Sequence, residues 1–212
     1  MRKSLLFLSA LMCFSVLTGC GASEAEQAAM DKMSADYSDT FSYEKREGDG
    51  FLVKSDALDA DVYVEQADDG EYHDNYLAVK YEDETKSYIE DCVAQFYDNA
   101  IVHFEAPQTG LTGGLSADAD FASYMTDSGA MLMGVIELRD SDYLTQFDVS
   151  RMAGAMAMYG TSFDFDFVVL SDDVFDTLSV DEIRERIESG DVVAHADLIK
   201  QGDSVQINWV SE

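Results

Sequence analysis

Residues 162–170 read Ser-Phe-Asp-Phe-Asp-Phe-Val-Val-Leu and are the most informative segment for the fold. Phe163, Phe165 and Phe167 recur at every second position, and Asp164 and Asp166 occupy the positions between them. Alternation of apolar and acidic side chains predicts a β-strand with one buried face and one polar face. The segment therefore predicts a sheet that packs against an aromatic core on one side.

Two more strands are predicted nearby, over residues 192–199 and 205–210, with a turn at 201–203. If the three strands are neighbours, one sheet face carries the following polar side chains: Asp164, Asp166, His195, Asp197, Gln206 and Asn208. Carboxylate oxygens suit a hard divalent cation, so Asp164, Asp166, His195 and Asp197 are candidate metal ligands. A solvated face of an antiparallel sheet is the simpler alternative.

Helices and strands are also predicted elsewhere in the chain. Ser23 with Glu26, and Ser179 with Glu182, have the spacing of capping boxes that begin helices. Further helices are predicted over residues 77–96, 118–125 and 144–159, and strands over 41–44, 51–53, 62–65, 101–104 and 131–138. This order predicts a single compact α+β domain over residues 24–212, with an antiparallel or mixed sheet and packed helices. A subdivision is possible near the Gly-rich segment 107–116.

The first twenty residues have the features of an export signal. Arg2 and Lys3 precede an apolar run that is too short to span a bilayer. The run ends in Leu17-Thr18-Gly19-Cys20, which resembles the lipobox of bacterial lipoproteins. The resemblance implies removal of residues 1–19, diacylglyceryl transfer to the Cys20 thiol, and a short tether over 20–23. The lipid bilayer would then be a partner, and the protein would be anchored on the extracytoplasmic face of the cell membrane.

The body has a second resemblance, carried by short motifs and by the order of its elements. Asp74-Asn75-Tyr76 opens a predicted helix, and Thr109-Gly110-Leu111 follows later in the chain. With the signal and the short strands, this order is similar to uncharacterised lipoproteins of Gram-positive gut bacteria. That resemblance implies no activity.

Composition narrows the classes of function. The formal net charge is −30, with 43 acidic and 13 basic residues among 212, which excludes nucleic acid as a partner. The chain has neither a G-x-S-x-G elbow nor an H-E-x-x-H zinc pair. We therefore expect no catalytic residue and no cofactor.

The sulfur-containing residues have simple interpretations. Cys92 lies in a helical pattern and is read as a small buried apolar residue. Five methionines lie on a predicted strand and on the predicted helix that follows it, so their thioethers could together bind Cu(I). Packing in the core is the simpler interpretation. The five methionines are Met131, Met133, Met152, Met156 and Met158.

The sequence thus predicts an exported, membrane-anchored, non-catalytic lipoprotein that binds a protein or envelope component of unknown identity. Two alternatives stay open. The first is a lipoprotein that binds a divalent cation or a small solute, and the second is an immunity-type inhibitor.

Overall fold

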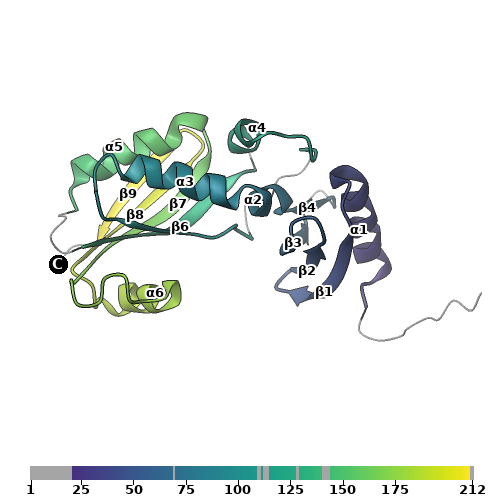
Figure 1. Ribbon diagram of the computed structural model, residues 1–212, viewed down its shortest axis with the longest axis horizontal. Coiled ribbons are helices and arrows are strands. Elements are labelled where there is room, and N and C mark those ends of the chain that lie inside the picture. The colour runs from purple at the N-terminus through teal and green to yellow at the C-terminus, as the bar shows by residue number, and fades with distance from the viewer. Residues whose placement is uncertain are drawn as a thin grey trace, which may run out of the picture.

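The structure is a computed structural model, and it describes residues 21–210 apart from 69, 109, 110, 112–114, 128 and 140–143. The predicted lipobox lies outside the described residues. The predicted α+β class is confirmed, with helices packed on two separate sheets (Figure 1). One sheet has four strands in the order β1-β2-β3-β4, and the other has five in the order β5-β6-β7-β8-β9.

The N-terminal part consists of one helix packed on an antiparallel sheet. Its elements are α1 (Glu24–Tyr37), β1 (Phe41–Glu47), β2 (Gly50–Ser55), β3 (Ala60–Gln66) and β4 (Tyr72–Asp74). The capping box at Ser23 is formed as predicted. Helix α1 buries Met30, Met33 and Tyr37 within the main core. Strand β4 was not predicted, because three residues are too few to show a periodic pattern.

The predicted helix over residues 77–96 is wrong in one respect, since the chain forms two helices there. They are α2 (Tyr76–Lys80) and α3 (Glu82–Val93), and Tyr81 interrupts them with φ −107° and ψ 20°. The Tyr81 ring stacks on Tyr124, with ring centroids 5.8 Å apart, and its hydroxyl donates to the Ala119 carbonyl at 2.5 Å. Tertiary contacts therefore override the helical periodicity at this position.

The C-terminal part is a mixed sheet with helices on both faces. Its elements are β5 (Ile101–Phe104), α4 (Phe121–Thr126), β6 (Met131–Arg139), α5 (Gln146–Met156), a 3₁₀ turn (Ala157–Tyr159), β7 (Ser162–Leu170), α6 (Val180–Ser189), β8 (Ala194–Gln201) and β9 (Ser204–Val210). Strands β6 and β7 are parallel, and every other neighbouring pair is antiparallel. The last strand of the first sheet ends at Asp74, and the first strand of the second sheet begins at Ile101. The change from one sheet to the other thus comes before the segment 107–116, near which the sequence suggested a possible subdivision.

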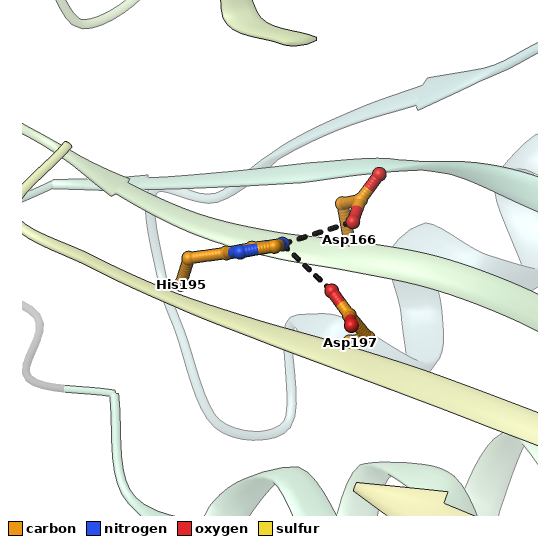
Figure 2. Close-up of side chains that lie close together, drawn as sticks. All are labelled: Asp166, His195 and Asp197. Carbon is orange, nitrogen blue, oxygen red and sulfur yellow. Dashed lines mark hydrogen bonds and ion pairs between the residues drawn. The ribbon is translucent and has the colours of Figure 1, made fainter. Parts of the chain in front are cut away.

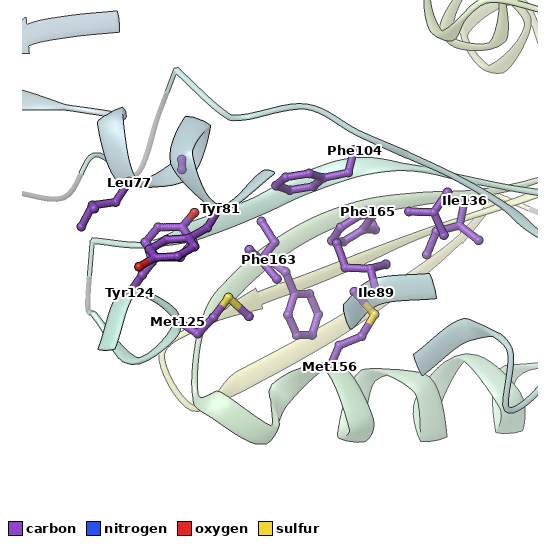
Figure 3. Packing of buried hydrophobic residues seen from close by; sticks show 14 of the residues in the cluster. Leu77, Tyr81, Ile89, Phe104, Tyr124, Met125, Ile136, Met156, Phe163 and Phe165 are labelled. Atoms are coloured by element: carbon purple, nitrogen blue, oxygen red, sulfur yellow. The ribbon is translucent and has the colours of Figure 1, made fainter. Parts of the chain in front are cut away.

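The two faces of the five-stranded sheet are covered unequally (Figure 1). Helices α3 and α5 cover one face, where Phe163, Phe165 and Phe167 are fully buried, as the alternation predicts. Figure 3 shows Phe163 and Phe165 packed beside Ile89 of α3 and Met156 of α5. On the other face, α6 covers only a small apolar cluster: Val135, Val168, Leu170 and Ile183. Among the described residues, no helix is long and apolar enough to cross a bilayer.

Candidate metal centre

The partly covered face of the five-stranded sheet carries the predicted polar side chains. The strand registers place five residues in one row across the sheet: His103, Val135, Asp166, Asp197 and Asn208. Side chains of paired residues project from the same face. The predicted adjacency of the three C-terminal strands is therefore confirmed, and so is their shared polar face.

Three of the four candidate ligands lie in direct contact (Figure 2). The Nε2 atom of His195 lies 2.9 Å from Asp166 Oδ1 and 2.9 Å from Asp197 Oδ1. One ligand atom from each residue can be chosen so that all three atoms lie within 4.8 Å of one another. The His195 side chain is 7% exposed, whereas Asp166 and Asp197 are 34% and 31% exposed. The cluster is thus buried on the imidazole side and open on the carboxylate side.

The strand register explains why these three residues meet. Asp166 of β7 lies directly opposite Asp197 of β8, and His195 lies opposite Val168. His195 and Asp197 are two positions apart on β8, so both project from the same face. The imidazole reaches diagonally across the ladder to Asp166, which is within the reach of a long side chain.

The electrostatics of the cluster follow from this packing. The hydrogen bond to Asp166 raises the pKa of His195, although burial opposes that rise. Burial raises the pKa of Asp197, and the neighbouring Asp166 adds to the rise, while His195 lowers it. Burial also raises the pKa of Asp164, with further contributions from the charges of Asp166 and Asp197. The carboxylates of Asp166 and Asp197 therefore lie where an additional positive charge is favoured, and Asp164 adds negative charge from beside them.

The spacing of the three ligand atoms suits a divalent cation. Transition metals bind imidazole nitrogen and carboxylate oxygen at about 2.1 Å, so neighbouring ligands are about 3.0 Å apart in an octahedral site and about 3.4 Å apart in a tetrahedral one. The two distances from Nε2 of His195 to Asp166 and Asp197 are 2.9 Å, so binding an octahedral ion would need almost no movement of the three atoms and a tetrahedral ion a movement of about 0.5 Å. Because both carboxylates are partly exposed, water can complete the coordination sphere from the solvent side.

The other predicted residues of this face lie outside the group of three. Asp164 projects from the same face and pairs with Ile199, one step along from the cluster. Asn208 lies opposite Asp197, and its amide lowers the pKa of that carboxyl. Gln206 is exposed on β9.

The prediction from sequence missed a second polar pair on this face. His103 Nε2 lies 3.0 Å from Oε2 of Glu137, whose side chain is fully buried. The signal was available, because Glu137 is an acidic residue inside the predicted apolar strand 131–138.

The methionines do not form a copper site. Met152 and Met156 are fully buried in the core, as the simpler interpretation predicted. Met131 and Met133 pair with Ser162 and Asp164, so they project from the opposite, polar face. Met158 is 71% exposed. Cys92 is buried, also as predicted.

Comparison with known proteins does not assign the chain to a family. No protein-family model, curated protein or solved structure matches the chain.

Proposed function

We propose that this protein is an exported, lipid-anchored, non-catalytic protein that binds one divalent transition-metal ion on the open face of its five-stranded sheet. The observation that carries the proposal is the convergence of Asp166, His195 and Asp197, with both oxygen atoms 2.9 Å from the same nitrogen. Among the functions left open by the sequence, this convergence favours the cation-binding alternative.

The donor set selects the class of ion. Calcium binds six to eight oxygen ligands, and magnesium retains several of its water ligands, so neither ion favours a buried imidazole nitrogen as a ligand. One nitrogen and two carboxylate oxygens suit Mn²⁺ or Zn²⁺. The buried imidazole would fix the ion on the protein side, and the exposed carboxylates would neutralise its charge.

The anchor determines where such a site would work. The Leu17-Thr18-Gly19-Cys20 motif supports lipidation of Cys20 and an extracytoplasmic location. Replacing Cys20 by alanine should leave the protein unprocessed or released from the membrane fraction. If the cleaved Cys20→Ala protein still partitions into the detergent phase, the lipid anchor is contradicted. That result would not affect the proposal of a cation site. Binding of a protein or envelope component, and the immunity-type function, stay predictions from the sequence.

The cation site is tested by calorimetric titration of the body, residues 21–212, with Mn²⁺ and Zn²⁺. The buffer should contain excess Mg²⁺, because a body with this net charge attracts divalent ions non-specifically. We expect one saturable site, weakened about tenfold or more by His195→Gln and by Asp197→Asn.

Asp164→Asn is the matched control, since it removes one charge from the same face outside the group of three. Equal affinity of the wild type and of the His195→Gln protein would refute the proposal. So would equal weakening by Asp164→Asn and Asp197→Asn, because that result would indicate diffuse charge attraction.

A further inference from the structure

We propose that a second site on the same sheet face binds a small zwitterionic solute, of the chemical class of a free α-amino acid with an apolar side chain. The site is a hollow of about 310 Å³ between β5, β6 and α6. Six of the residues that line it determine which solute it suits: His103, Glu105, Gln108, Met133, Val180 and Arg184. The inference is independent of the cation site, because none of the three proposed metal ligands lines this hollow.

A buried carboxylate fixes one wall of the hollow. Glu137 is fully buried, and its Oε1 accepts the backbone N–H of Asp176 at 2.8 Å. Its Oε2 lies 3.0 Å from His103 Nε2. A buried carboxylate needs such donors to offset the loss of its hydration. Glu137 is therefore a positioning residue that holds the proton of His103 on Nε2.

The tautomer decides what His103 offers to a ligand. With the proton on Nε2, the neutral ring presents Nδ1 as a hydrogen-bond acceptor. This nitrogen has no hydrogen-bond partner among the described residues, and the His103 side chain is 23% exposed. The carboxylate of Glu105 lines the same hollow. These two acceptors together suit an ammonium group.

The opposite wall supplies donors. Arg184 of α6 is 48% exposed, and its one ion pair among the described residues, with Asp181, is long at 3.9 Å. A guanidinium group can bind a carboxylate through two parallel hydrogen bonds. The side-chain amide of Gln108 donates one hydrogen to Glu47 Oε1 at 3.4 Å and has a second hydrogen for a ligand. The site therefore combines a group for a carboxylate with groups for an ammonium ion.

Charge and size restrict the solute further. Of the described residues that line the hollow, Arg184 is the one permanent cation and Glu105 the one acidic side chain, so a zwitterion matches these walls better than a simple anion or cation. Met133 and Val180 provide apolar surface for the body of the solute. The volume is at the lower end for ligand pockets, which fits a single small molecule.

Leucine and two analogues test the inference by NMR titration of the body, residues 21–212, at up to about 10 mM probe. Isocaproate lacks the amine of leucine, and isoamylamine lacks its carboxylate. We expect leucine to bind at least about tenfold more tightly than either analogue, with shifts in the signals of His103. Chelator is added throughout, so that a failure of the cation site cannot affect the result.

Four single variants assign the roles of the walls. Arg184→Gln should lower the affinity for leucine to that of the wild type for isoamylamine, which lacks the carboxylate. Glu105→Gln should lower the affinity for leucine towards that of the wild type for isocaproate, which lacks the amine. His103→Phe should weaken leucine, while the nitrogen shifts of His103 in Glu137→Gln should report a changed tautomer. Arg186→Gln is the control, because it removes a charge from the same helix outside the hollow.

Two results would overturn the inference. One is the absence of leucine binding to the folded wild-type protein. The other is equal binding of leucine, isocaproate and isoamylamine, which would indicate apolar contact without recognition of either charge.

Discussion

Asp74 is expected to make the stability of this protein depend on pH in an unusual direction. The residue is 7% exposed at the end of β4, where its Oδ1 accepts the Tyr37 hydroxyl at 2.8 Å and the Tyr76 backbone N–H at 3.0 Å. Burial raises the pKa of Asp74 from 3.8 to about 6, although both hydrogen bonds lower it. Burial therefore outweighs the two donors.

The sign of the effect follows from linkage. A folded state with the higher pKa binds the proton more tightly, so this contribution to stability is complete below pH 3.8 and is lost as the pH rises through about 6. At about 1.4 kcal/mol per pKa unit, the rise corresponds to about 3 kcal/mol. Asp74→Asn keeps an acceptor for Tyr37 and Tyr76 but cannot ionise. The variant should therefore gain about 2–2.5 kcal/mol over the wild type between about pH 4 and pH 7, since the rest of the change falls outside that range.

Urea unfolding of both proteins across this pH range measures the difference. Using the difference between two proteins cancels the repulsion among the many other carboxylates. Asp31→Asn is the control, because Asp31 is exposed on α1, where it accepts a hydrogen bond from Gln27. If the Asp74→Asn and wild-type stabilities stay parallel from about pH 4 to pH 7, the buried carboxylate is not destabilising and the reasoning is refuted.

Three shorter predictions concern the sheet and its helices. Gly134→Ala would place a methyl group against the backbone oxygen of His103, so we expect a loss of about 1–3 kcal/mol in urea unfolding. Ser179→Ala removes the hydroxyl that accepts the Glu182 N–H at the start of α6 and should cost about 1 kcal/mol, visible as a lower melting temperature. Cys92 is 4% exposed, and burial raises the pKa of its thiol. A thiol reagent should therefore modify Cys92 only after urea unfolds the protein, and rapid modification of the native protein would contradict its burial.

Local patterns in the sequence predicted most of the elements, because local contacts fix them. The alternation in residues 162–170 predicted both faces of β7, and it matches the observed strand bounds. The capping boxes at Ser23 and Ser179 predicted two helix starts. Gly160 ends the 3₁₀ turn with φ 84°, a left-handed conformation that glycine allows without strain.

The rest of the structure depends on contacts between distant residues. The interruption at Tyr81 requires Tyr124 and Ala119, which no periodicity within residues 77–96 could reveal. The parallel pairing of β6 with β7 is a matter of topology, and alternation is the same in parallel and antiparallel neighbours. His103 and Glu137 are 34 residues apart, so their hydrogen bond appears only once β5 lies beside β6.

The candidate ligands could be grouped from sequence because one register brings them together, and that same register supports the proposed cation site. A solvated sheet face needs only polar side chains, whereas this face places Asp166 directly opposite Asp197. Like charges in directly opposed positions destabilise a sheet. Here the cost is offset by His195, which is drawn almost completely out of solvent to lie 2.9 Å from both carboxylates. The arrangement therefore has one position at which a positive charge relieves the repulsion, whether a proton or a metal ion supplies it. A divalent ion would relieve it more fully than a proton, because two carboxylates face that position.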